Sequence, residues 1–155
     1  MLVKLYELPD DAAAMARIAE HGVVLRPAMP YDLDKVRSWI TKHFSPGWAA
    51  EVSSAWSRQP IPCVLAIRDG KLLGFASYDT TSRGFFGPTG VDEAERGKGI
   101  GVALLFAALK GLRDLGYGYA FIGMAGPKEF YNRHVGAVEI PGSDPGVYAH
   151  LLKSE

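Results

Sequence analysis

Hydrophobic residues recur along the chain with two periods, and these periods predict where the helices and strands lie. Residues 31–43 predict a helix because apolar side chains recur three, six or seven positions apart, at Leu33, Val36, Trp39 and Ile40. Further helices are predicted over residues 12–20, 48–57, 102–115 and 127–134. Strands are predicted over residues 2–8, 23–27, 62–68, 72–78, 85–91, 117–123, 137–140 and 147–152. The order of these elements predicts one mixed α/β layer structure.

The strand predicted over residues 85–91 is interrupted in its middle. Gly87, Pro88 and Gly90 are poor residues for a central strand, because proline removes a hydrogen-bond donor and glycine marks a bulge or a close backbone approach. We therefore expect this strand to open away from a neighbour. Residues 117–123 follow the longest predicted helix and are the expected parallel partner, since parallel strands need a crossover connection.

Composition limits the class of protein. The chain of 155 residues suits one domain, and 48% hydrophobic with 22% charged residues is typical of a globular protein. Residues 1–22 are interpreted as an N-terminal extension, an edge strand and a helix, packed on the domain that residues 23–155 form. The 17 basic residues balance the 17 acidic ones, which removes the electrostatic argument for binding nucleic acid or an anionic membrane.

The sequence carries no pattern typical of a membrane span, a signal peptide or a metal site. No apolar run approaches the roughly 20 residues of a membrane span. Residues 1–7 are too short and too charged for a signal peptide, so a cytoplasmic location is expected. The single Cys63 lies in an apolar run and is predicted to be a small core residue. No metal is expected, because no paired ligand spacing joins the histidines, which are His21, His43, His134 and His150.

A glycine-rich stretch, Arg96-Gly97-Lys98-Gly99-Ile100-Gly101, separates the interrupted strand from the longest predicted helix. Glycine at a helix start lowers helix propensity by roughly 1 kcal/mol per residue relative to alanine, so three glycines need a separate reason. Without Cβ atoms, a ligand can approach the amides of the first turn. Those amides and the helix dipole favour a phosphate or pyrophosphate, and the stretch therefore predicts an anion site.

Two well-known phosphate-binding loops do not fit this stretch. A dinucleotide fingerprint starting at Gly97 or Gly99 needs a third glycine, which would fall on Val102 or Leu104. A P-loop needs Ser or Thr directly after Gly-Lys, where this chain has Gly99. The stretch instead matches the Arg/Gln-x-x-Gly-x-Gly/Ala element of the GCN5-related N-acetyltransferases, in which the preceding strand ends in a valine, here Val91. The chain thus resembles that family.

The resemblance implies a fold and a co-substrate. The implied fold is the acyl-CoA N-acyltransferase fold, a single-domain mixed sheet that is splayed at its centre and flanked by helices. Acetyl-CoA (coenzyme A) would be the co-substrate, and no metal would take part. In this family the pantetheine arm pairs with the backbone of the opened strand, and the glycine-rich loop would hold the phosphates. The implied cofactor-binding residues are Thr89, Gly90, Val91, Arg96, Gly97, Lys98, Gly99, Ile100 and Gly101.

Residues 130–137 resemble the Phe-Tyr-x-x-x-Gly-Phe segment of the same family. There the tyrosine usually acts as general acid toward the cofactor sulfur, and Tyr131 is the catalytic residue that the resemblance implies. A phenol with a pKa near 10 is protonated at neutral pH and can donate. The other interpretation is an aromatic pair that only packs a short helix. The segment departs from the family at Ala137, where the family has Phe, and at Met124 and Pro127, where it often has Asn and Ala.

Two classes of function follow from the resemblance. The first is an N-acetyltransferase that moves an acetyl group from acetyl-CoA to a primary amine of a small molecule or peptide, by direct attack in a ternary complex. The second is a noncatalytic acyl-CoA-binding or sensing module, which would not need Tyr131. Residues 31–60 and 141–146 would select the acceptor, whose identity stays open, as do the acyl-chain preference and the formation of a homodimer. The general base also stays open among Glu51, His43, Asp92, Glu93 and His150.

Overall fold

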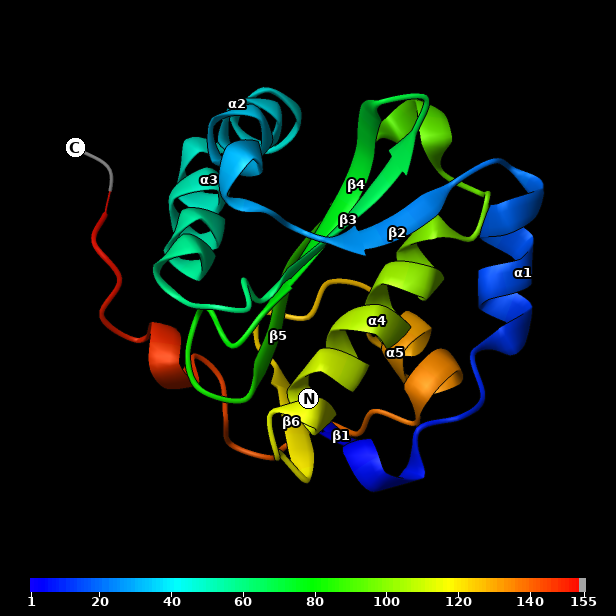
Figure 1. Cartoon of the computed structure of the whole chain (residues 1–155). Helices are drawn as coiled ribbons and strands as arrows, with labels where there is room; N and C mark the ends of the chain where they lie inside the picture. Colours follow the sequence, from blue (N-terminus) through cyan, green and yellow to red (C-terminus); the bar gives the residue numbers. More distant parts are fainter. Residues whose placement is uncertain (154–155) are drawn as a thin grey trace.

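A six-stranded sheet forms the centre of the computed structural model, which describes residues 1–153 (Figure 1). The strands lie in the order β1-β6-β5-β4-β3-β2. β5 and β6 run parallel, and the other neighbouring pairs are antiparallel. The predicted single-domain mixed α/β fold is confirmed. The strand bounds are Leu2–Lys4 (β1), Val24–Pro27 (β2), Cys63–Arg68 (β3), Lys71–Tyr78 (β4), Phe85–Val91 (β5) and Tyr119–Ile122 (β6).

Helices cover both faces of this sheet (Figure 1). One face is covered by α2 and α3, and the other by α4 and α5, with α1 beside α4. Short 3-10 turns form the outer ends of two predicted helices, at Pro30–Asp32 before α2 and at Ser54–Ser57 after α3. The helix bounds are Ala12–Glu20 (α1), Leu33–His43 (α2), Pro46–Ser53 (α3), Ile100–Asp114 (α4) and Lys128–Val135 (α5).

Two apolar clusters hold the layers together. The larger lies between the sheet and the α4 side, and the smaller lies under α2 and α3. Eight side chains of α4 are buried, from Ile100 to Leu112, because the helix contacts the sheet on one side and α1 on another. Cys63 belongs to the smaller cluster, where burial raises the pKa of its thiol to about 12. The cysteine is therefore the buried core residue that the sequence predicts.

The edge of the sheet beyond β6 is formed by the N-terminus of the chain. β1 pairs antiparallel with β6, in the register Leu2 with Phe121 and Lys4 with Tyr119. The two strands predicted over residues 137–140 and 147–152 are wrong. The first is reduced to a single bridge between Val138 and Leu2, and the second is a 3-10 turn, Gly146–Tyr148, followed by irregular chain. Proline and glycine punctuate residues 141–146, and they favour turns over a hairpin ladder.

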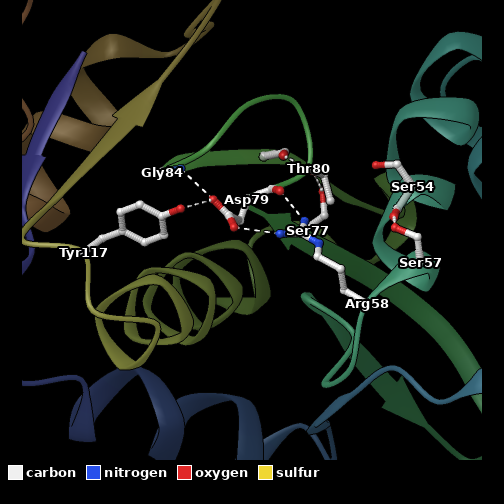
Figure 2. A network of polar contacts seen from close by, with 9 residues as sticks. Ser54, Ser57, Arg58, Ser77, Asp79, Thr80, Gly84 and Tyr117 are labelled. Atoms are coloured by element: carbon white, nitrogen blue, oxygen red, sulfur yellow. Dashed lines mark hydrogen bonds and ion pairs between the residues drawn. The ribbon is translucent and has the colours of Figure 1, made fainter.

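A buried carboxylate fastens the β4–β5 hairpin to the start of β6 (Figure 2). Asp79 accepts hydrogen bonds from Arg58 Nη1 at 2.7 Å, from the Tyr117 hydroxyl at 2.8 Å and from the Gly84 amide at 2.6 Å. The Phe121 amide of β6 then donates to the Gly84 carbonyl at 2.9 Å. Burial alone would raise the pKa of Asp79, but the hydrogen bonds from Gly84, Tyr117 and Arg58 outweigh it and lower the pKa. This network keeps β5 and β6 together at one end.

We expect Asp79→Asn to lower the free energy of unfolding by about 2 kcal/mol at pH 7, because the amide group turns a donor toward donors in a buried site. This free-energy change is small for a broken buried ion pair, because the Arg58 side chain is 35% exposed and can be solvated by water. A carboxylate whose pKa is lowered on folding stabilises the protein above its unfolded pKa of about 4, and this contribution is lost as the pH falls through the folded value.

Urea unfolding of parent and variant at pH 7 and at pH 3 measures this effect. The difference in the free energy of unfolding between the parent and Asp79→Asn should be smaller at pH 3 than at pH 7. Asp34→Asn is the matched control, because Asp34 pairs with Arg37 on the surface with 84% of its side chain exposed. Equal stability of parent and Asp79→Asn at pH 7 would contradict the role of the network.

In residues 1–153 no helix is long and apolar enough to cross a membrane. The same residues contain no group of three or more His, Cys, Asp or Glu side chains placed to hold a metal ion.

Candidate cofactor and active site

The two parallel strands at the centre of the sheet pair over a very short length. Phe85 and Phe86 of β5 lie opposite Phe121 and Ile122 of β6, and no further pair joins the two strands. β5 continues to Val91, but this part pairs only with β4, from Thr89 opposite Ala76 to Val91 opposite Gly74. Within the described chain, the β6-facing edge of Gly87–Val91 therefore has no strand partner. The expected opening of this strand is present, and it leaves backbone groups for an extended ligand to pair with.

Side-chain hydroxyls support the irregular part of β5. The register with β4 shifts between Ala76 and Tyr78, because Gly87 and Pro88 of β5 form a bulge opposite the single residue Ser77. Ser77 donates its hydroxyl to the Pro88 carbonyl at 3.2 Å, and Thr80 donates to the Gly87 carbonyl at 3.0 Å. These bonds satisfy carbonyl groups that the bulge removes from the ladder. The opening is thus a supported feature of the sheet.

The glycine-rich loop lies at the open end of β5, directly after Val91. Asp92 caps a 3-10 turn, Glu93–Glu95, by accepting a hydrogen bond from the Ala94 amide at 3.0 Å. Gly97 and Gly99 both have a φ of 82°, in the left-handed region where glycine is favoured, and Gly99 is the N-cap of α4. The loop thus presents the amide end of a 15-residue helix, which carries a partial positive charge.

The charged side chains around the loop differ in whether an ion pair within the protein already engages them. Glu95 forms a bidentate ion pair with Arg68, at 2.6 and 3.0 Å, and a second ion pair with Lys98 at 2.7 Å. Hydrogen bonds from Arg68 and then Lys98 lower the pKa of Glu95 to about 2. Lys98 is therefore held by an ion pair, but the one Glu95 carboxylate is shared with Arg68, so the three side chains keep a net positive charge. Arg96 is exposed, and no hydrogen bond or ion pair is found for its side chain in the described part of the protein.

The glycines among the predicted cofactor-binding residues differ in how much space surrounds their Cα atoms. An added Cβ would find open space at Gly97 and only an ordinary contact at Gly101, 3.8 Å from Val91 Cγ2. At Gly99 it would lie 2.9 Å from Arg17 Cδ, so the space there is filled by an arginine stem. At Gly90 it would clash with the ring of Phe44, which gives that glycine a packing reason of its own.

Two of the predicted cofactor-binding residues have side chains engaged within the protein. Ile100 is 1% exposed, so only its backbone can face a ligand. Thr89 donates its hydroxyl to the Phe75 carbonyl at 3.0 Å, which likewise leaves its backbone as the group for a ligand.

Tyr131 lies at the point where β5 and β6 separate. Its ring contacts Phe86, the last residue of β5 that pairs with β6, at a centroid distance of 6.0 Å and an angle of 71°. The residue is 7% exposed, and burial raises the pKa of its phenol. No hydrogen bond to its hydroxyl is found within residues 1–153, and no enclosed side-chain polar atom there lacks a partner. The hydroxyl is therefore partly exposed, and its raised pKa keeps it protonated at neutral pH.

The helix that carries Tyr131 ends in a glycine with left-handed geometry. Gly136 has a φ of 64° and donates its amide to the Asn132 carbonyl, and the Ala137 amide reaches back to the Tyr131 carbonyl at 3.3 Å. Ala137, which departs from the family pattern, is fully buried in the larger cluster. The local pattern around Tyr131 therefore has a structural basis in addition to its proposed chemistry.

A cavity of about 790 Å³ lies beside the first part of β5 and the end of β6. Phe85 and Phe121 line it, and so do residues 139–148, which include the loop expected to select the acceptor. The ring of Tyr148 rests on Gly123, where it leaves no room for a Cβ. Burial first, and the nearby Glu51 second, raise the pKa of Tyr148. Gly123, which directly follows the last residue of β6 that pairs with β5, therefore lines the cavity.

The five candidate bases lie in different surroundings. Glu51 accepts a hydrogen bond from the Thr81 hydroxyl and faces Tyr148 of the cavity wall. His43 is stacked on Trp39 at 4.3 Å, and Asp92 is used as a cap. Glu93 and His150 are exposed. Glu51 is the candidate linked to the cavity, because its charge raises the pKa of Tyr148 in the cavity wall.

Comparisons with known proteins agree with this geometry. The chain matches the family model described as the acetyltransferase (GNAT) family over residues 33–136, which is more than half of its length. The chain therefore belongs to the GNAT family, whose members are acetyltransferases. No curated protein matches it.

Solved structures share the fold at low sequence identity. A glucosamine N-acetyltransferase region of a fungal multi-domain β-N-acetylglucosaminidase has a TM-score of 0.70 at 15% identity, covering 86% of this chain and 19% of that chain. A GNAT acetyltransferase from Brucella melitensis, solved with acetyl-CoA, has a TM-score of 0.58 at 23% identity. The match covers 73% of this chain and 81% of that chain. A GNAT N-acetyltransferase from Escherichia coli, solved with CoA, has a TM-score of 0.57 at 22% identity. The match covers 72% of this chain and 67% of that chain. This chain thus spans about a fifth of the fungal protein.

Sequence reasoning missed two parts of this region. Arg17 lies on the loop from a helix 80 residues earlier, and Tyr148 borders the cavity from a segment that was expected to be a strand. Neither position lies within a motif of its own. Only the three-dimensional contacts bring them to the site.

Proposed function

We propose that this protein is an N-acetyltransferase that moves an acetyl group from acetyl-CoA to a primary amine of a small molecule or peptide. The observation that carries the proposal is the opening of β5 from β6 after two residue pairs, with the glycine-rich loop at the open end and Tyr131 at the point of separation. An extended ligand can pair with the open edge while its phosphates meet the amides at the start of α4. The CoA-bound relatives support this arrangement by fold.

The reaction is a direct attack in a ternary complex. The nitrogen of the neutral amine bonds to the thioester carbonyl carbon, the carbon–sulfur bond breaks, and the thiolate takes up a proton. Tyr131 is the proposed donor of that proton, and two observations support this role: burial raises its pKa, and its hydroxyl has no internal partner in the described chain. The acceptor would enter through the cavity beside β6, where Glu51 is the favoured group to receive a proton from the amine.

Turnover of acetyl-CoA with a panel of amines tests the proposal. The panel should hold amino sugars, polyamines, amino acids and peptides with free N-termini, and release of the CoA thiol is the signal. We expect at least one class to raise thiol release above the rate without acceptor, and the acetylated amine should appear in equal amount. Stabilisation by CoA without turnover on any amine would favour the noncatalytic acyl-CoA-binding module. Absence of stabilisation by CoA would contradict both functions.

A further inference from the structure

Helix α1 lies alongside α4 (Figure 1). One polar contact near each end of α1 joins it to α4 or to the loop before α4. Asp11, at the start of α1, forms an ion pair with Lys110 of α4 at 2.6 Å. Arg17, in the last turn of α1, donates from Nη2 to the Gly97 carbonyl at 2.6 Å. The two helices therefore run in opposite directions, and the end of α1 meets the loop that precedes α4.

The contact of Arg17 with the loop has two parts. Its aliphatic stem lies across Gly99, so closely that a Cβ at that position would be 2.9 Å from Arg17 Cδ. Its guanidinium then bonds to Gly97. Arg17 forms no ion pair with an acidic side chain in residues 1–153, in contrast to Arg68 and Lys98, which share Glu95. Its positive charge is thus brought to the loop without a compensating carboxylate.

The hydrogen bond to Gly97 has a consequence for the next amide. In a trans peptide the carbonyl and the N–H point in opposite directions. Because Arg17 draws the Gly97 carbonyl toward α1, the N–H of Lys98 in the same peptide is turned away from α1. Gly97 and Gly99 each have a left-handed φ, so the loop has conformational freedom that an external contact can restrict.

We propose that Arg17 is a positioning residue of the phosphate site, which orients the amides of residues 97–99 and adds a positive charge beside them. The inference rests on the proposed binding of CoA. It assigns a binding role to the N-terminal helix, which lies outside the segment that the family model matches. The part of CoA that depends on Arg17 is the phosphate-bearing half, and the pantetheine half is independent of it.

Dissociation constants of parent, Arg17→Met and Arg17→Lys for three probes test this role. CoA carries both halves, ADP carries the pyrophosphate without pantetheine, and pantetheine carries no phosphate. Methionine keeps a stem over Gly99 but removes the donors and the charge. We expect Arg17→Met to weaken CoA and ADP by about tenfold, the effect of one lost hydrogen bond involving a charged group, and to leave pantetheine unchanged. Lysine retains a charge and a donor and should restore part of the loss.

Arg113→Met is the matched control. It makes the same change of charge in the last turn of α4, roughly 20 Å from the loop at 1.5 Å per residue, and Arg113 is exposed. This variant should bind all three probes as the parent does, because charges at that distance are screened at 0.15 M salt. An equal tenfold loss in the control would mean that net charge alone acts, and would overturn the inference.

Two further outcomes would also overturn it. Parental affinity of Arg17→Met for CoA would remove Arg17 from the site while leaving the proposed function intact. A loss for pantetheine as large as that for ADP, with a lower melting temperature, would mean that Arg17 only supports the fold. A parent protein that does not bind CoA would contradict the proposed function itself, and the inference with it.

Discussion

Tyr131→Phe is expected to bind CoA as the parent does while kcat falls by a factor of about 10² to 10⁴, the usual contribution of a general acid. This loss corresponds to roughly 3 to 5 kcal/mol of barrier. Phenylalanine keeps the edge contacts with Phe86 and Phe130 and removes only the hydroxyl. Because no internal hydrogen bond to that hydroxyl is found in the described chain, stability should change little. The measurements are kcat at steady state, the rate constant of the chemical step in a single-turnover experiment, and the affinity for CoA.

Tyr117→Phe is the matched control for this prediction. Its ring is half-buried, whereas that of Tyr131 is buried, and its hydroxyl donates to Asp79 at 2.8 Å in the network that joins the hairpin to β6. Removing it should lower the free energy of unfolding by about 1 to 2 kcal/mol and leave kcat unchanged. The two variants therefore have opposite signatures. A Tyr131→Phe enzyme with parental kcat, under conditions where chemistry limits turnover, would mean that another group or solvent protonates the thiolate.

The central elements of the fold could be predicted because their residues carry strong local signals. β5 spans the predicted residues 85–91, since its own glycines and proline mark both the strand and its opening. α4 begins at Ile100, two residues before the predicted start, because Gly99 in the left-handed region serves as its N-cap. Apolar periodicity located the faces of α2 in the same way, with Val36 and Ile40 buried.

The edge strand predicted over residues 2–8 is present only as β1, Leu2–Lys4, because a 3-10 turn, Leu5–Glu7, follows it. Its neighbours in the sheet could not be predicted, because an edge depends on which segment arrives there. Residues 137–140 are predicted to form a strand, yet β1 is the strand that pairs with β6, and Val138 forms only one bridge, to Leu2 of β1. Leu2 and Val138 are distant in sequence, so no local pattern decides between them. Tertiary competition for one sheet edge overrides the propensity of each segment.

The same distinction holds for the candidate site, where the local motifs could be predicted and the contacts between distant elements could not. The loop from Arg96 to Gly101 and the Tyr131 segment were recognised because each is a short motif with a backbone requirement. The partners of the loop were not: Lys98 is held by Glu95, and Arg17 reaches Gly97 from α1. Phe44 likewise supplies a packing reason for Gly90 that the sequence does not show. Side chains from other elements decide which of the motif residues can face a ligand.

Gly101→Glu is expected to weaken CoA binding by about 100-fold or more without unfolding the protein. Gly101 is the second residue of α4, and an added Cβ would make only an ordinary contact with Val91. In the proposed site, a carboxylate there would face the CoA phosphates with like charge, and two unit charges 4 Å apart near a protein surface interact by about 4 kcal/mol. The fold should gain slightly, since glutamate replaces glycine in a helix and complements the dipole at its N-terminus, each effect being worth up to about 1 kcal/mol.

The opposite signs of these two effects make the variant informative. Melting temperature without ligand should stay level or rise, whereas the stabilisation by added CoA should vanish over the concentration range that stabilises the parent. Gly101→Gln is the matched control, because it adds nearly the same volume without the charge, and it should retain more affinity than Gly101→Glu. The difference between the two variants should shrink as salt is raised, since salt screens exposed charges. If Gly101→Glu is stabilised by CoA as strongly as the parent, the phosphates do not lie at the start of α4.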